Sequence, residues 1–106
     1  MRRLAVLAMA AVLPLAANAT EAAGGQAVFM RWCTHCHGAQ AAAPGTLRLA
    51  WNRGDAPTPL TAREDLSAAY VRQVVRQGLY EMPPFRTTEI SRADLDAVVT
   101  FLTRQP

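Results

Sequence analysis

The segment WCTHCHG, residues 32–38, constrains this chain more than any other stretch of its sequence. It holds both cysteines, Cys33 and Cys36, and both histidines, His35 and His37, of a 106-residue chain. A chain of this length forms one domain with a modest apolar core, and small domains commonly need a disulfide, a metal or a cofactor for stability. The segment is therefore the place to look for whatever stabilises the fold.

Three kinds of chemistry use two cysteines with this spacing. A thioredoxin-like dithiol would need the strands of a βαβ unit, and no alternating run in this sequence predicts a strand. A structural zinc site needs four ligands, and the only histidine besides His37 is His35, inside the same segment. The third is covalent haem attachment through C-x-x-C-H, in which both thiols bond to the haem and the histidine binds the iron.

The spacing favours haem attachment. Two residues between the cysteines let both sulfurs reach one edge of a flat ring, and His37 then lies under the metal. His35 cannot reach the far side of a ring that its neighbours tether, so we expect it to face solvent. We therefore expect one haem c, covalently bound to Cys33 and Cys36, with His37 as an iron ligand.

Residues 1–19 have the layout of a secretory signal peptide: a basic start, an apolar run and an A-N-A cleavage pattern. The apolar run is shorter than the roughly 20 residues that span a bilayer, although a retained membrane anchor is the alternative. We expect cleavage after Ala19, a mature domain of residues 20–106 without a membrane span, and a periplasmic location. Removing the two arginines of the basic start lowers the net charge from +3 to +1. With no basic patch and interleaved aromatic residues, nucleic acid is not an expected partner.

Apolar periodicity predicts an all-α fold with about three helices and long loops. The first helix covers about residues 22–32. The second lies between an N-cap at Ser67 and Gly78, which we expect to end it in the left-handed conformation. The third runs from an N-cap at Ser91 to about Arg104.

The second helix has two distinct faces. Its apolar stripe, which we expect to face the core, is formed by Tyr70, Val71, Val74 and Val75. Its polar side, which we expect to face water, is formed by Arg72, Gln73, Arg76 and Gln77. Between the first two helices, residues 38–66 show no sustained periodicity and are rich in Ala, Pro and Gly. They predict a long loop that wraps a cofactor.

Met82 is the candidate for the second axial position of the iron. The methionines of the signal peptide leave with it, and Met30 lies three residues before Cys33, on the tethered side. Pro83 favours an extended conformation at Met82, and with Pro84 it stiffens the loop. The alternative is that Met82 fills a gap in the core.

Ligation by His37 and Met82 leaves the iron without an open position. Such a protein passes single electrons and is not itself an enzyme, and a thioether ligand raises the reduction potential. If Met82 does not bind, a ligand-binding sensor or a peroxidase-like site remains.

The chain resembles the small class I cytochromes c. The resemblance covers residues 20–106 and rests on the C-x-x-C-H segment together with Gly25, Phe29, Met82-Pro83, Val98 and Phe101-Leu102. It implies a small cytochrome c fold in which the first and last helices cross tightly, with Gly25 and Phe29 against Val98 and Phe101. It also implies that the carbonyl of Pro44 accepts a hydrogen bond from the ring N–H of His37.

Three segments, APGTLRLAWNRG, DLSAAYVRQVVRQG and MPPFRTTEISRADLDAVVTFL, are similar to cytochromes that accompany flavoproteins of the p-cresol methylhydroxylase and vanillyl-alcohol-oxidase type. That similarity implies a flavoprotein dehydrogenase of para-alkylphenols as electron donor and a redox carrier or oxidase as acceptor. The alternative is a general carrier that serves a terminal oxidase or another dehydrogenase. We expect the PPFR segment, residues 83–86, to lie in the docking surface. Arg86 is a candidate to contact an acidic partner or a haem propionate, and the alternative is that it is solvated. Trp51 is a candidate to donate its ring N–H to a propionate, and the alternative is that it covers the haem.

Overall fold

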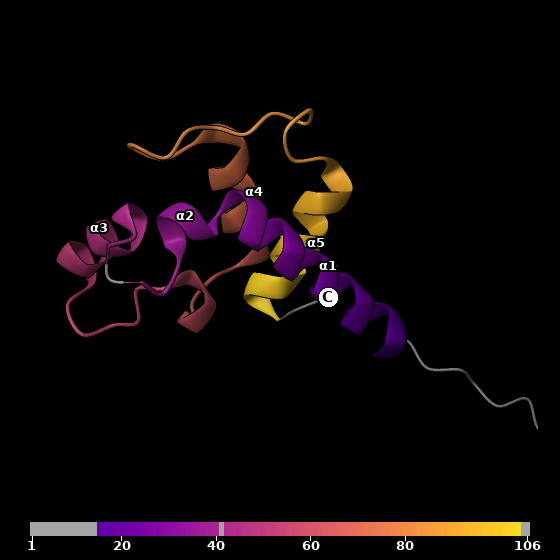
Figure 1. Ribbon diagram of the computed structural model, residues 1–106, viewed down its shortest axis with the longest axis horizontal. Helices are drawn as coiled ribbons and strands as arrows, with labels where there is room; N and C mark the ends of the chain where they lie inside the picture. The colour runs from indigo at the N-terminus through magenta and orange to yellow at the C-terminus, as the bar shows by residue number, and fades with distance from the viewer. Residues whose placement is uncertain (1–14, 41, 105–106) are drawn as a thin grey trace, which may run out of the picture.

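The computed structural model describes residues 15–40 and 42–104, with side chains from Gly24 onward. This part of the chain folds into helices joined by loops (Figure 1): α1 (Leu15–Trp32), α2 (Thr34–His37), α3 (Pro44–Arg53), α4 (Ala68–Gln77), α5 (Arg92–Thr103) and a 3₁₀ turn (Leu60–Ala62). Within the described ranges there is no strand, only an isolated bridge between Leu79 and Met82. The predicted all-α class is confirmed. None of the described helices is long and apolar enough to cross a membrane.

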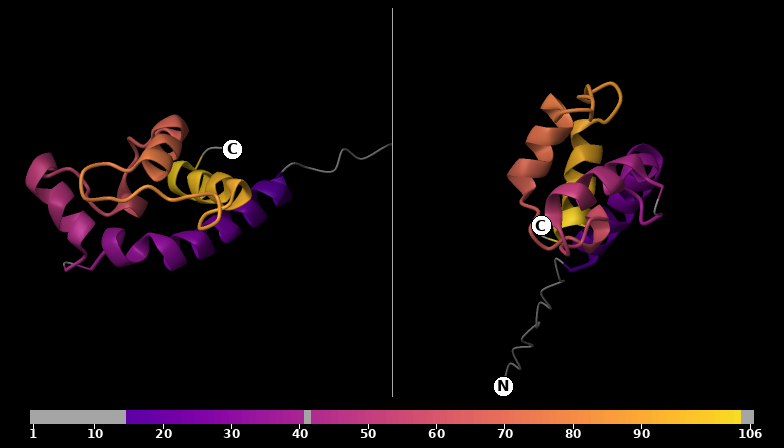
Figure 2. Two further views of the ribbon diagram at one scale, coloured as in Figure 1. Left: turned by 90° about the horizontal axis from the view of Figure 1, so that it is seen from above. Right: turned by 90° about the vertical axis from the view of Figure 1, so that its left-hand side faces the viewer.

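Helices α1 and α5 cross in close contact, and Figure 2 shows α5 lying against α1. Gly25 of α1 is buried at the crossing. A Cβ on this residue would run into the carbonyl oxygen of Ala97 and would lie 2.7 Å from the Cβ of Phe101. One turn further on, the rings of Phe29 and Phe101 are 5.7 Å apart between centroids. Only glycine lets the two backbones approach this closely, which confirms the crossing that the resemblance implied.

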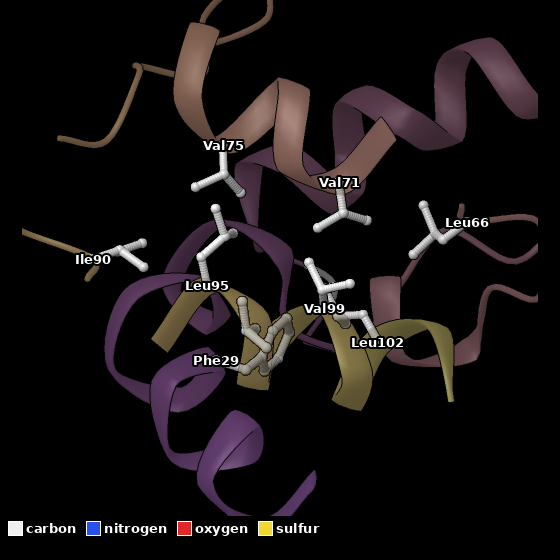
Figure 3. Packing of buried hydrophobic residues seen from close by; sticks show 9 residues of the cluster. Phe29, Leu66, Val71, Val75, Ile90, Leu95, Val99 and Leu102 are labelled. Atoms are coloured by element: carbon white, nitrogen blue, oxygen red, sulfur yellow. The ribbon is translucent and has the colours of Figure 1, made fainter. Parts of the chain in front are cut away.

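One apolar core joins α1, α4 and α5. Its members, each nine-tenths or more buried, are Phe29, Leu66, Val71, Val75, Ile90, Leu95, Val98, Val99 and Leu102. In Figure 3, Val71 and Val75 of α4 point toward Val99 and Leu95 of α5. The apolar stripe predicted on α4 is therefore right for these two valines. It is wrong for Tyr70, which is 45% exposed.

The ends of α4 and α5 follow local sequence signals. The hydroxyl of Ser67 accepts a hydrogen bond from the N–H of Tyr70 at 3.2 Å, and that of Ser91 accepts one from Asp94 at 3.0 Å, as N-caps do. Gly78 ends α4 with a positive φ of 75°, as expected, but its ψ of 172° is extended and not left-handed helical. The chain turns directly into the Leu79–Met82 bridge, and a Cβ on Gly78 would lie 2.6 Å from the carbonyl oxygen of Met82.

The long loop predicted for residues 38–66 is wrong in part, since it contains α3 and the 3₁₀ turn. Pro44 is at the start of α3, where its fixed φ suits a helix and no N–H is needed. Thr46 is the one buried residue of α3, and its hydroxyl donates to the carbonyl of Gly38 at 2.7 Å. A helix that buries so little has no apolar periodicity, so its sequence pattern did not reveal it.

Helix α1 also differs from its prediction, because it begins at Leu15 and not near Ala22. Three of the seven added residues are alanine, which has the highest helix propensity. Residues 1–14 of the predicted signal peptide lie outside the described residues. Cleavage after Ala19 stays a prediction.

Candidate haem-binding site

The C-x-x-C-H segment forms a single helical turn. Cys33 separates α1 from α2, and its carbonyl accepts the N–H of Cys36 at 3.1 Å and that of His37 at 2.8 Å. The N–H of Cys33 in turn donates to Phe29 at 2.9 Å, so the turn continues the direction of α1. Residues three and four positions apart share one face of a helix. The structure thus brings Cys33, Cys36 and His37 to one face, and their roles stay predictions.

The imidazole of His37 is half-buried against α3. A Cβ on Gly45 would lie 2.8 Å from its Cε1 and 2.9 Å from its Nδ1. Burial, and then the positive charge of Arg63, lower the pKa of His37 below its usual value, which favours the neutral ring that a metal requires. Nδ1 is buried and has no hydrogen-bond partner among the described residues.

The implied hydrogen bond from His37 to the carbonyl of Pro44 is absent from the described contacts. Pro44 is the first residue of α3, so its carbonyl oxygen points along the helix axis. The expectation of a proline carbonyl beside the ring is therefore wrong in this structure. Gly45 is the residue that packs on the imidazole.

Both thiols are free. Cys33 is half-buried against the core, and burial, with a smaller contribution from Cys36, raises the pKa of Cys33 to about 11. A reactive cysteine has a lowered thiol pKa, so Cys33 does not have the character of the attacking thiol of a thioredoxin-like site. Among the residues described, no group of three His, Cys, Asp or Glu side chains could hold a bare metal ion.

Met82 lies on the loop between α4 and α5. Leu79 and Met82 exchange two backbone hydrogen bonds of 3.0 and 2.9 Å, which close a tight turn with Tyr80 at a positive φ of 51°. The N–H of Phe85 donates to the carbonyl of Val75 at 2.8 Å and attaches the loop to α4. Figure 2 shows the loop extending over α2 toward α3.

Cys33 and Met82 border the same apolar cluster. Both side chains are half-buried and pack against the core, together with those of Trp32, Leu60 and Phe85. The rings of Trp32 and Phe85 meet edge to face, with centroids 5.9 Å apart. Met30, the other methionine of residues 20–106, is 58% exposed on α1. Met30 is not among the residues that pack against the core, whereas Met82 is.

These residues fit a covalently attached haem. Two free thiols and a neutral imidazole share one face of a turn. The imidazole has an unpaired buried nitrogen, and the glycine beside it leaves room that a Cβ would fill. Aromatic side chains and a thioether from the opposite loop border the same region. His35 is exposed, as predicted.

Two arginines near this site were not predicted. The side chain of Arg63 is only 10% exposed and pairs with both carboxylate oxygens of Asp65 at 2.9 Å, and Arg53 reaches the same carboxylate at 3.1 Å. These residues lie within residues 38–66, which were expected to form a loop, and no sequence pattern there predicts a contact.

Arg76 was expected on the polar side of α4, facing water. It is instead half-buried and donates to three backbone carbonyls. The one sequence feature that could have indicated this contact is the position of Arg76 in the last turn of α4, where basic side chains can donate to free carbonyls.

Trp51 and Arg86 do not reach the cluster. Trp51 is 74% exposed on α3, with the guanidinium of Arg48 over its ring at 5.8 Å. The side chain of Arg86 is 81% exposed and lies 3.6 Å from the carboxylate of Glu89. Their expected contacts with a partner or a propionate stay predictions.

The family model described as "Cytochrome C oxidase, cbb3-type, subunit III" matches residues 20–102. No curated protein and no solved structure matches the chain. The matched range holds most of the chain, including the C-x-x-C-H turn, the Met82 loop and the α1–α5 crossing. The chain therefore belongs to this family of c-type cytochrome domains, binds haem c covalently and carries electrons.

Proposed function

We propose that this protein is a periplasmic monohaem cytochrome c that accepts single electrons from a flavoprotein dehydrogenase of para-alkylphenols and passes them to the respiratory chain. The observation that carries the electron-carrier part is the placement of the C-x-x-C-H turn and the Met82 loop on one apolar cluster. The sequence has a single C-x-x-C-H motif, which supports one haem. Cys33 and Cys36 attach it, and His37 and Met82 are the iron ligands.

Bound haem c supplies an iron that gains and loses one electron. The thioether of Met82 favours the reduced state and raises the reduction potential relative to a second histidine. The lowered pKa of His37 keeps its imidazole neutral, and so available as a ligand. The rings of Trp32 and Phe85 meet edge to face and border the same apolar region. His37 and Met82 would both hold the iron, which would leave catalysis to the partner.

The flavoprotein donor is supported by the three sequence segments named above. The surface that would receive it contains the turn between α4 and α5, where Leu79 is 43% and Tyr80 89% exposed. Pro83, Pro84 and Arg86 are exposed on the same loop. Electron-transfer partners commonly meet through small interfaces, and an apolar patch with a polar rim suits one.

A second candidate is favoured by the family match, whose description names a subunit of a cbb3-type cytochrome c oxidase. In that case the chain would be a carrier or a subunit that serves a terminal oxidase. Its ligands and its electron-transfer chemistry would be the same.

Stopped-flow reduction of the purified holoprotein tests the choice. Mixed with a flavoprotein of the p-cresol methylhydroxylase type and its alkylphenol, the oxidised cytochrome should be reduced faster than by the alkylphenol alone. No acceleration, together with rapid oxidation of the reduced cytochrome by a cbb3-type oxidase, would overturn the flavoprotein partner and favour the second candidate.

A further inference from the structure

Arg76 links the Met82 loop to α4. Its side chain is half-buried at the last turn of α4. Nη1 donates to the carbonyl of Phe85 at 3.1 Å and to that of Ile90 at 2.8 Å, and Nη2 reaches the carbonyl of Ser91 at 3.4 Å. The three acceptors come from both ends of residues 85–91, so one guanidinium closes this segment onto the helix.

The loop has few other hydrogen bonds to the rest of the protein. The N–H of Phe85 donates to Val75 at 2.8 Å. The Leu79–Met82 pair, and the bonds from Glu89 and Ile90 to Arg86, lie within the loop itself. Pro83 and Pro84 have no N–H to donate. Much of the attachment of this loop to the rest of the protein therefore passes through Arg76.

Only an arginine suits this arrangement. Its planar group presents several donors in a fixed fork, whereas a lysine ammonium is a compact charge that would not span the same acceptors. Partial burial strengthens such charge-assisted bonds and makes each carbonyl costly to leave unpaired.

We propose that Arg76 is a positioning residue for Met82. By tying the carbonyls of Phe85 and Ile90 to α4, it holds the loop closed and keeps Met82 against the apolar cluster that Cys33 also borders. The inference rests on the proposed axial role of Met82. It goes beyond that role by naming the group that maintains the ligation.

Arg72 provides a matched control. It lies one turn earlier on the same helix, its side chain is 44% exposed, and its Nη2 pairs with the carboxylate of Asp96 on α5. It makes no described contact with the Met82 loop. Arginine and glutamine have similar helix propensities, so a change to glutamine at either position leaves the helix itself nearly unaffected.

The test compares Arg76→Gln, Arg76→Lys, Arg72→Gln and Met82→Ala as holoproteins. Two properties are measured: the weak far-red Fe(III)–S absorption band of the oxidised form and the affinity for imidazole, which competes for the axial position. Loss of one or two charge-assisted bonds should raise the population of the open loop about tenfold, and imidazole should bind about tenfold more tightly to Arg76→Gln. Arg76→Lys should lie between this variant and the wild type, and Arg72→Gln should match the wild type. A purely structural role of Arg76 would lower the midpoint of unfolding without changing imidazole affinity under native conditions.

The outcomes separate the two proposals. If Met82→Ala loses the band while Arg76→Gln keeps wild-type imidazole affinity, the positioning role of Arg76 is wrong and the ligation by Met82 stands. If the wild type lacks the band and Met82→Ala changes nothing, the axial role of Met82 fails and the inference about Arg76 fails with it. Should Arg76→Gln not accumulate with haem, Arg76→Lys decides: tighter imidazole binding than the wild type supports the inference, and equal binding overturns it.

Discussion

At the scale of single residues, Met82 decides between an electron carrier and a ligand-binding site. Its side chain is half-buried and, like those of Phe85 and Cys33, packs against the apolar core. We expect Met82→Ala to lose the far-red Fe(III)–S band, to bind imidazole more tightly and to have a lower reduction potential. The reason is that the soft sulfur stabilises the reduced iron.

Met30→Ala is the matched control for Met82→Ala. The side chain of Met30 is 58% exposed on α1, so its removal should leave spectrum and potential unchanged. If Met82→Ala kept the band, Met82 would be a core-filling residue, and the sensor alternative would be favoured.

Gly45 is a second residue whose role depends on its neighbours. A Cβ there would lie 2.7 Å from the carbonyl oxygen of Cys36 and 2.8 Å from Cε1 of His37. We expect Gly45→Ala to displace the imidazole and to lower the free energy of unfolding of the holoprotein by about 1–3 kcal/mol, as overpacking does. Denaturant titration measures it, and a shifted reduction potential should accompany the loss.

Gly24→Ala serves as the comparison, since a Cβ at residue 24 meets nothing within 4 Å. Wild-type stability and potential in Gly45→Ala would contradict the role of Gly45 as the surface on which His37 packs.

At the scale of elements, the sequence predicted the features that depend on neighbouring residues, such as helix N-caps, and not those that depend on distant ones. Helices α4 and α5 follow N-caps at Ser67 and Ser91, where a serine hydroxyl accepts a hydrogen bond from the first turn, and the sequence predicts both caps. Helix α3 was missed because it lies on the surface and buries little, which leaves no apolar period to detect. The role of Arg76 was missed for a different reason. Its three acceptors lie 9, 14 and 15 residues away, and only the folded loop brings them together.

The candidate site likewise contains residues that the sequence predicts and a residue that only the fold reveals. The C-x-x-C-H segment and Met82 are marked by residue type and spacing, so the sequence predicts their roles, which stay predictions. Arg63 is not marked, because it approaches His37 only through the fold.

The crossing of α1 and α5 depends on one glycine. We expect Gly25→Ala to lower the free energy of unfolding by about 1–3 kcal/mol or more, because its Cβ would meet the backbone of Ala97, which cannot rotate away as a side chain can. The adjacent Gly24→Ala, on the same helix but in open space, should be neutral or stabilising by up to about 1 kcal/mol through helix propensity. Equal free energies of unfolding of the two variants in denaturant titrations would show that α1 and α5 can move apart at Gly25 without loss of stability, and would contradict the role of this glycine.

At the scale of the whole molecule, the apolar core and the candidate haem site are continuous. Phe29 lies in the core one turn before Cys33, and Trp32 and Phe85 extend the same packing to the Met82 loop. A small domain buries too little apolar surface to be stable by a wide margin. Attachment of haem beside the core would therefore serve both electron transfer and folding. Substitutions in the core or at the haem site should affect both the stability and the reduction potential.

We expect Asp65 to contribute to the acid sensitivity of the molecule. Its carboxylate joins Arg63 of the central loop and Arg53 of α3, and these bonds hold the pKa of Asp65 well below its usual range, with Arg63 as the main cause. A lowered native pKa means that the unfolded chain takes up a proton first as the pH falls. The stabilisation is therefore complete above the unfolded pKa of about 4 and is lost as the pH drops below it.

We accordingly expect the free energy of unfolding of the wild type to fall between about pH 4 and pH 2, and to fall less steeply in Asp65→Asn. Denaturant titrations across that range measure the two slopes. Arg63→Gln should flatten the slope more than Arg53→Gln, because Arg63 makes two bonds of 2.9 Å to the carboxylate and Arg53 makes one of 3.1 Å. Parallel slopes in the wild type and Asp65→Asn would mean that the acid response arises elsewhere. Glu89 would then be the next residue to test, since the backbone N–H of Arg86 also lowers its pKa.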